Sequence, residues 1–243
     1  MESKTLGVLG GLGPMSSAYF YEMLTAHTKA ERDSDHLNIL ISSRADTPDR
    51  TDYILGHSEK NPLPIMNDEV NKLIGAGADI IAIPCNTAHY FYEGISASAD
   101  VPVINIIRQT ALFCFRSGFK KVGLLATEGT VRSGAYAEIF LKAQIECITP
   151  AESDQAEITD IIYGKIKKGI MPDKKDFLKI SDKLFALGCE KVILGCTELS
   201  LLKREFDLGD EFTDSLEVLA LSAIKLCGKE PTGFSSELMR FKP

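Results

Sequence analysis

The sequence predicts an α/β protein with two pseudo-symmetric lobes, each a mostly parallel sheet covered by helices. Apolar, β-rich segments alternate with helical ones, which is the rhythm of parallel βαβ units. Two apolar segments end alike, at Cys85 and at Cys196, each followed within two residues by threonine. Two others, around Gly7 and Gly123, each run into a glycine-containing turn, and the two pairs are separated by nearly equal intervals. This repeat predicts two lobes with the same order of elements and a site in the cleft between them.

The individual elements follow from the same alternation. Short runs of apolar and β-branched residues predict strands at 5–10, 37–42, 79–84, 101–104, 121–126, 145–148 and 190–195. Longer segments with helical spacing predict helices at 16–32, 65–76 and 173–187.

The remaining segments predict a lid and the lobe boundaries. Segment 43–64 has no apolar period and is rich in Asp, Pro, Arg and Gly, so we expect a long loop over the crevice. We expect the first lobe to comprise 1–107 plus 213–243, and the second lobe 108–212.

Composition narrows the functional classes. The chain has 243 residues and a net charge of −7, which disfavours nucleic acid or an anionic membrane surface as a partner. Its amino terminus leads directly into a strand, and no apolar run is long enough to span a bilayer, so we expect a cytoplasmic protein. The six cysteines lack the dense spacing of a disulfide scaffold, which indicates a reducing compartment.

The two repeated cysteines are the candidate reactive groups. The carboxyl ends of parallel strands line the ligand crevice of an open α/β sheet, and a helix amino terminus there favours negative charge. We therefore expect Cys85 and Cys196 to lie where a thiolate is stabilised and to meet across the cleft. The alternative is that both are small, inert, buried residues.

A glycine turn at 10–14 follows the first predicted strand and leaves two interpretations open. It fits a dinucleotide fingerprint incompletely, because Ser42, Ser43 and Arg44 stand where an acidic residue is expected, a change that suits the 2′-phosphate of NADP. Alternatively, its backbone amides face a substrate carboxylate. A Walker A motif is absent from the sequence.

Metal and hydrolase chemistry are poorly supported. The four histidines are scattered, and no Cys-x-x-Cys or Gly-x-Ser-x-Gly motif occurs. Only His89 is near a candidate cysteine, and we interpret it as a capping or supporting residue. The site prediction therefore includes no metal.

Five motifs occur in the order typical of one family. They are Gly-Gly-Leu-Gly-Pro at 10–14, Pro-Asp-Arg-Thr at 48–51, Pro-Cys-Asn-Thr-Ala-His at 84–89, Gly-Leu-Leu-Ala-Thr at 123–127 and Gly-Cys-Thr-Glu at 195–198. Over nearly the whole chain, the sequence resembles the aspartate/glutamate racemase superfamily, particularly its aspartate racemase branch. The resemblance implies a cofactor-independent amino-acid racemase, commonly a homodimer, with its active site between two lobes.

Racemisation by proton transfer needs a base on one face of Cα and an acid on the other. Two facing cysteines fill both roles, one as thiolate and one as thiol. Donors near the strand ends would stabilise charge on the substrate carboxylate, and Asn86, Thr87, Thr127 and Thr197 are the candidates, although each also suits a helix cap.

The resemblance further implies two cationic contacts. Arg50 matches the family arginine that binds the distal carboxylate of the substrate. Lys167 matches a substrate-binding lysine four residues after a tyrosine, although the neighbouring Lys165 and Lys168 leave that choice open.

The substrate is expected to be a small dicarboxylic amino acid. Glutamate racemases carry an acidic residue in the first turn and Cys-Thr-His in the second cysteine motif, so the resemblance favours aspartate. A broad-specificity racemase, a maleate-type isomerase and a non-catalytic two-lobed binding protein stay open as alternatives. Both cysteines are present, which argues against the single-cysteine decarboxylases of the superfamily.

Overall fold

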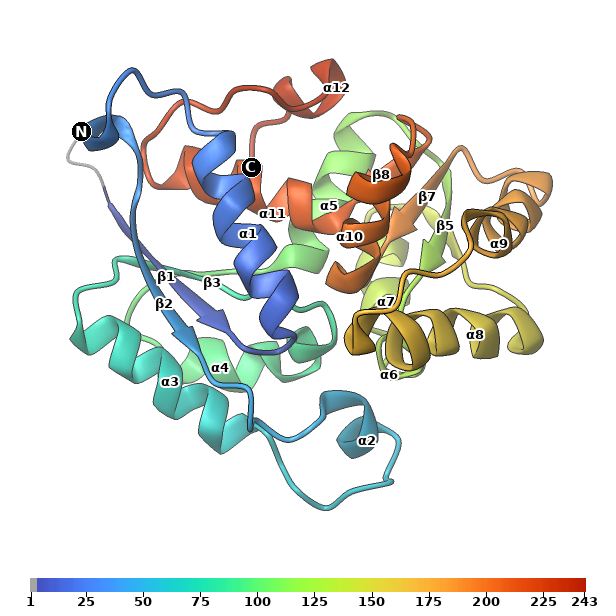
Figure 1. Cartoon of the computed structure of the whole chain (residues 1–243), viewed down its shortest axis with the longest axis horizontal. Helices are drawn as coiled ribbons and strands as arrows, with labels where there is room; N and C mark the ends of the chain where they lie inside the picture. The colour runs from blue at the N-terminus through green and yellow to red at the C-terminus, as the bar shows by residue number, and fades with distance from the viewer. Residues whose placement is uncertain (1–3) are drawn as a thin grey trace.

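The computed structural model describes residues 4–243 and contains two four-stranded sheets in which all neighbouring strands are parallel (Figure 1). The first sheet has the order β2-β1-β3-β4 and the second the order β6-β5-β7-β8, so the strand pattern is the same in both. The predicted fold class is therefore confirmed. The strands are β1 (Thr5–Gly10), β2 (Asn38–Ser43), β3 (Ile80–Ala82), β4 (Val103–Ile104), β5 (Lys121–Leu125), β6 (Glu146–Ile148), β7 (Lys191–Leu194) and β8 (Phe212–Asp214).

Helices connect the strands and cover the sheets (Figure 1). The α-helices are α1 (Pro14–Ala26), α2 (Arg50–Ile54), α3 (Leu63–Gly75), α4 (Tyr92–Ser98), α5 (Ile106–Arg116), α6 (Glu128–Arg132), α7 (Ala135–Lys142), α8 (Glu152–Thr159), α9 (Lys174–Ala186), α10 (Thr197–Phe206), α11 (Ser215–Leu226) and α12 (Ser236–Met239). Short 3₁₀ helices are η1 (Asp33–Asp35), η2 (Thr87–Phe91) and η4 (Ile166–Lys168), and η3 (Asp160–Lys165) is a π-helix.

The seven predicted strands are all present, with ends shifted by at most two residues. β8 was not predicted as a strand, because the same residues were expected only to carry the chain back to the first lobe. The predicted long loop also contains α2, which begins at Arg50. The helix predicted for 16–32 ends earlier, at Ala26, and Thr28 then forms a β-bridge with Pro231.

A single apolar cluster joins the two sheets. Leu6 and Val8 of β1 belong to the same buried cluster as Val122 and Leu124 of β5, together with residues of α1, α5 and α11. Helix α11 packs against both α1 and α5 and lies between the sheets (Figure 1). At about 25 cal/mol per Å² of apolar surface buried, this shared core strongly opposes separation of the lobes.

The lobe boundaries stay a prediction. Helix α5 begins at Ile106, and β8 pairs with β7 in the second sheet before α11 returns toward α1. None of the helices between residues 4 and 243 combines the length and the apolar character that crossing a membrane requires.

Candidate active site

The carboxyl ends of corresponding strands in the two sheets face one small cavity. Cys85 follows β3 and Cys196 follows β7, and both side chains line this cavity. Its volume is about 10 Å³, enough for about one water molecule, so the site is closed. The structure brings all eight predicted site residues to it: Arg50, Cys85, Asn86, Thr87, Thr127, Lys167, Cys196 and Thr197. The sequence prediction missed four further lining residues, Leu12, Thr51, Tyr163 and Glu198.

Both thiols are buried, with 5% of each residue exposed. Backbone N–H groups of the following turn lower the pKa of each, from Ala88 for Cys85 and from Glu198 for Cys196. Burial outweighs them, so the pKa of both thiols is raised above the ordinary value. The expectation of a favoured thiolate is thus wrong for the closed cavity, although the helix N–H groups act in the expected direction.

Glu198 contacts one thiol directly. Cys196 Sγ donates a hydrogen bond to Glu198 Oε2 at 2.9 Å, and Thr197 Oγ1 lies 3.4 Å from the same oxygen. The carboxylate raises the pKa of Cys196 both by its charge and through this hydrogen bond. Since a thiolate cannot donate to a carboxylate, this contact corresponds to the thiol form of Cys196.

Arg50 is a buried cation without a carboxylate partner among the described residues. Only 6% of it is exposed, and its Nη atoms donate to the backbone carbonyls of Thr47, Pro48 and Leu12 at 2.9 to 3.3 Å. Its Nε is buried and has no hydrogen-bond acceptor. Because an unpaired buried charge is costly, this guanidinium calls for an anionic ligand.

Three threonine hydroxyls form a triangle that joins the two lobes. Thr87 Oγ1 lies 2.9 Å from both Thr127 Oγ1 and Thr130 Oγ1, which are 2.9 Å from each other. Thr127 also caps α6 by accepting from the Thr130 N–H, so its capping and ligand-donor roles coincide at one residue. Hydroxyls can turn their protons toward a carboxylate that enters the cavity.

The Asn86 side chain forms hydrogen bonds with two buried residues behind the cavity. Its Nδ2 donates to Ser215 Oγ at 3.0 Å, and its Oδ1 accepts from Tyr136 OH at 2.7 Å. One amide proton is left to point elsewhere. These buried bonds fix the orientation of the residue next to Cys85.

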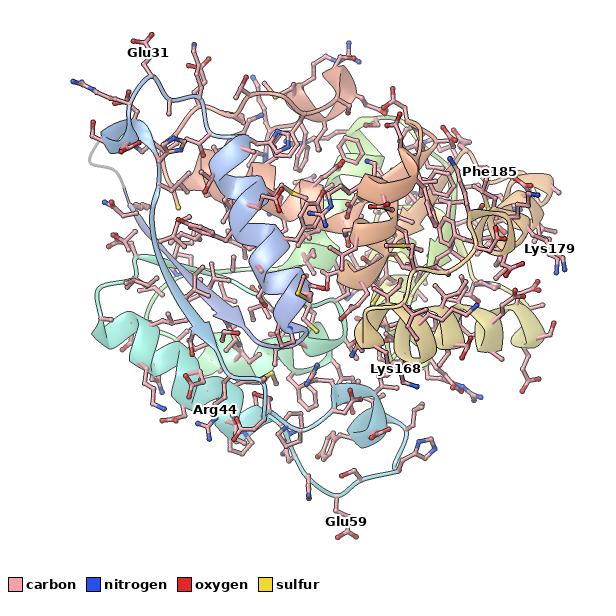
Figure 2. The ribbon with its side chains drawn as sticks, in the orientation of Figure 1. Glu31, Arg44, Glu59, Lys168, Lys179 and Phe185 are labelled. Carbon is pink, nitrogen blue, oxygen red and sulfur yellow. The ribbon has the colours of Figure 1, made fainter. Side chains whose placement is uncertain are left out.

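Lys167 is the lysine that faces the site. Its side chain is 25% exposed, and Nζ lies 4.0 Å from carboxylate oxygens of both Asp49 and Glu198. Lys165 instead lies 3.9 Å from Asp160, and Lys168 stands at the surface (Figure 2). Of the three candidates, only Lys167 lines the cavity.

Tyr163 connects η3 to the segment that contains α2. Its hydroxyl lies 2.9 Å from Thr51 Oγ1 and 3.3 Å from both carboxylate oxygens of Asp49. The Nζ of Lys167 lies 4.2 Å from the centre of its ring, a cation–π contact. The residue sits in the π-helix η3, and π-helical turns are frequent at functional sites.

The glycine turn at 10–14 packs closely against the Glu198 side chain. A Cβ at Gly13 would stand 2.5 Å from Glu198 Oε1, so a larger residue here would displace the Glu198 carboxylate. Arg44 directly follows β2 and forms ion pairs with Glu69 at 2.9 Å and Asp46 at 3.0 Å (Figure 2). A 2′-phosphate would have to displace these carboxylates, which disfavours the NADP hypothesis.

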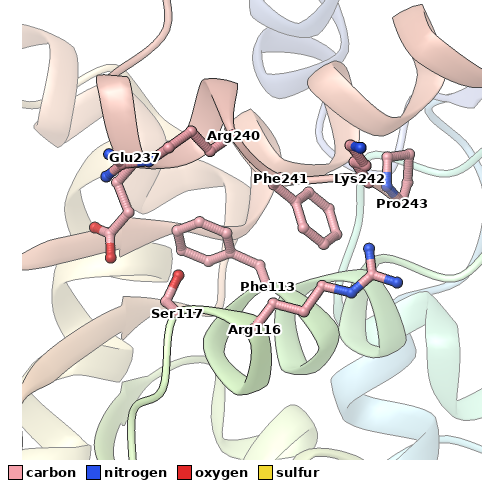
Figure 3. Close-up of a pocket in the computed structure, with 8 residues that line it drawn as sticks. All are labelled: Phe113, Arg116, Ser117, Glu237, Arg240, Phe241, Lys242 and Pro243. Atoms are coloured by element: carbon pink, nitrogen blue, oxygen red, sulfur yellow. The ribbon is translucent and has the colours of Figure 1, made fainter.

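A larger hollow of about 450 Å³ adjoins the closed cavity. Leu12, Arg50, Lys167 and Glu198 line both spaces and separate them. A different hollow of about 550 Å³, between α5 and the segment after α12, contains none of the predicted site residues (Figure 3). Among residues 4–243, no three His, Cys, Asp or Glu side chains are grouped so as to hold a metal ion.

His89 supports the Cys85 turn from behind. Its Nδ1 lies 2.8 Å from the Cys85 carbonyl oxygen, and its Nε2 accepts from the Ile106 N–H at 3.2 Å. Burial lowers the pKa of this histidine to about 4. It is therefore a neutral bracing residue, in agreement with the supporting role expected from the sequence.

The wild-type protein should lose stability as the pH falls from about 6.5 to about 4, and the variant His89→Gln should lose less. An unfolded histidine titrates near 6.5, so as the pH falls from about 6.5 to about 4 the unfolded chain binds a proton that the native state does not bind. This lowers the free energy of unfolding by about 3 kcal/mol over that window. Urea unfolding between pH 7 and pH 4.5 measures the slope, with the exposed His57→Gln as the matched control. Equal slopes for wild type and His89→Gln would contradict the assignment.

The sequence is similar to those of known racemases over most of its length. A model of the family described as Asp/Glu/Hydantoin racemase matches residues 9–223. A broad-specificity amino-acid racemase of Bacillus subtilis, RacX, is 27% identical over 90% of this chain and 96% of its own length. A glutamate racemase of Aquifex pyrophilus is 35% identical over 60% of this chain and 58% of its own length.

Two solved structures share the architecture. An aspartate racemase of Picrophilus torridus superimposes with a TM-score of 0.81 at 28% identity, covering 94% of this chain and 96% of its own. An aspartate racemase homologue of Pyrococcus horikoshii gives a TM-score of 0.75 at 26% identity, covering 92% and 99%.

Proposed function

This chain belongs to the Asp/Glu/hydantoin racemase family, and on that premise we propose that it interconverts L- and D-aspartate without a cofactor. The observation that carries the proposal is the pairing of two buried thiols with Arg50 in one cavity. The guanidinium has a free Nε and no carboxylate partner in the described chain, which suits the distal carboxylate of a dicarboxylic amino acid.

The reaction needs only proton transfers. The thiolate of one cysteine removes the Cα proton, and the electron pair left on Cα is delocalised into the substrate α-carboxylate. The thiol of the other cysteine then delivers a proton to the opposite face. The product is the other enantiomer, and the protonation states of the two sulfurs are exchanged.

The developing charge on the α-carboxylate needs donors. The hydroxyls of Thr87 and Thr127, with Thr130 behind them, supply donors from both lobes. The free amide proton of Asn86 and the hydroxyl of Thr197 are further candidates at the two cysteine turns. Lys167 completes the site as a second cation for the distal carboxylate, beside Arg50.

Broad specificity is the second candidate. The hollow of about 450 Å³ lies on the other side of Arg50 and Lys167 from the closed cavity, so a longer side chain that passes between these residues would have space there. We further propose that the protein acts in the cytoplasm as a homodimer, without nucleic-acid or membrane partners, as the family resemblance and the net charge of −7 imply.

Purified enzyme should exchange the Cα proton of both aspartate enantiomers in deuterated water and racemise both. We expect this activity without pyridoxal phosphate and after exhaustive treatment with a chelator, because the proposed chemistry uses only side chains. Proton NMR follows exchange, and chiral chromatography follows racemisation, with glutamate, alanine and lysine as comparison substrates. A strict need for pyridoxal phosphate would overturn the proposal. Equal turnover of alanine and lysine would replace aspartate specificity with broad specificity.

A further inference from the structure

The two thiols have different electrostatic surroundings. Cys196 donates a hydrogen bond to the Glu198 carboxylate at 2.9 Å, and that carboxylate is itself buried, with 5% exposed. No carboxylate accepts a hydrogen bond from Cys85 among the described residues, and the cation Arg50 lines the cavity with it. The two surroundings differ most at Glu198, which accepts a hydrogen bond from Cys196 and none from Cys85.

We propose that Glu198 holds the proton of Cys196 in place, so that Cys85 ionises first and the free enzyme is preset to use Cys85 as its base. This inference deepens the proposed racemase function and rests on it for its catalytic meaning. The preset enzyme accepts first the enantiomer whose Cα proton faces Cys85. The other enantiomer requires the form in which the proton has moved from Cys196 to Cys85.

Ionising Cys196 would exchange a favourable contact for a repulsive one. The hydrogen bond to Glu198 Oε2 would be lost, and two anions would then stand 2.9 Å apart in a closed cavity. Hydrogen bonds to charged groups contribute more than neutral ones, and burial strengthens the repulsion between like charges. Lys167 lies 4.0 Å from the other oxygen of Glu198 and offsets only part of this cost.

Glu198 raises the pKa of both thiols by its charge, but only Cys196 also donates a hydrogen bond to it. After burial, the largest influence on the pKa of Cys85 is Arg50, which lowers it, whereas for Cys196 it is Glu198, which raises it. Lys167 lowers the pKa of both thiols. Tyr163 stays neutral because burial and Asp49 raise its pKa, and Asp49 itself contacts Tyr163 and Lys167 rather than a sulfur.

Limited alkylation of the full chain tests the order of ionisation. Brief iodoacetamide labelling across pH 6 to 10, quantified by mass spectrometry of each cysteine peptide, measures thiolate formation site by site. We expect Cys85 to react at lower pH than Cys196 in the wild type. In Glu198→Gln, Cys196 should react at least about tenfold faster at a given pH, with a smaller change at Cys85.

Asp49→Asn is the matched control, because it removes a carboxylate that also lies 4.0 Å from Lys167 but bonds to no thiol. We expect Asp49→Asn to label Cys85 at lower pH than Cys196, as the wild type does. If Glu198→Gln fails to fold, Glu198→Asp, which withdraws the carboxylate from Sγ, should shift Cys196 in the same direction. The proposal is wrong if Cys196 labels before Cys85 in the wild type, or if neither change at Glu198 accelerates its labelling. Labelling needs no substrate, so absence of racemisation would overturn the proposed function and leave this result to stand by itself.

Discussion

Replacing either cavity cysteine with serine should lower the racemisation rate by about 10³-fold or more. General acid–base catalysis by a positioned side chain contributes about 10²–10⁴-fold. At neutral pH a serine hydroxyl is a much weaker acid than a thiol and does not ionise to act as the base in place of a thiolate. Cys85→Ser and Cys196→Ser each remove one partner of the proposed exchange. Cys147→Ser is the matched control, because Cys147 lies in β6, outside the cavity, and should leave turnover unchanged.

The two serine variants should differ in what they keep. In each, the surviving thiolate still reaches one face of Cα, so one enantiomer should exchange its proton with solvent while no racemisation follows. We expect the two variants to retain exchange of opposite enantiomers, measured by NMR in deuterated water. Racemisation near the wild-type rate in either variant would overturn the two-thiol mechanism.

Arg50→Lys should reduce kcat/KM for aspartate by about 10²–10⁴-fold. Hydrogen bonds to charged groups contribute about 1.5–3 kcal/mol each, and a lysine ammonium cannot present a planar fork to a carboxylate. The same substitution also weakens the contacts by which Arg50 ties Thr47, Pro48 and Leu12 together. Both effects therefore act in the same direction.

A second substrate separates these two effects of Arg50→Lys. Cα exchange of alanine, which has no distal carboxylate, should fall much less than exchange of aspartate if Arg50 binds that group. Arg44→Lys, in the same segment but paired with Glu69 and Asp46 outside the cavity, is the control and should keep its activity. Unchanged kinetics in Arg50→Ala would remove Arg50 from the site.

The sequence predicted the parts of the fold that depend on local pattern. Strands buried on both faces appear as continuous apolar runs, as in β3 and β7, and Cys85 and Cys196 come shortly after their ends. Because the carboxyl ends of parallel strands share one edge, residues next to them could be assigned to the site from the sequence alone. Arg50 and Lys167 lie outside strand ends, and their prediction depended on the family resemblance.

The parts that were missed depend on contacts between distant segments. β8 has only three residues and is held by pairing with β7, and the π-helix η3 has no sequence period that marks it. Tyr163 reaches the cavity through contacts with the distant residues Asp49 and Thr51, whereas Glu198 lies in the same turn as Cys196 and could have been assigned to the site from the sequence. The pKa of Cys85 and Cys196 depends on how completely the closed lobes exclude water, which no local motif encodes.

The closed cavity also determines the sequence of events in time. A space of about 10 Å³ cannot hold an amino acid, so the cavity has to open once to admit the substrate and again to release the product. Because α1, α5 and α11 share one core, we expect this opening to involve the segment around Arg50 and the η3–η4 segment, which line the cavity from outside that core. Each cycle then contains two mechanical steps and one chemical step. Substitutions far from either sulfur can change turnover by altering how often the cavity opens.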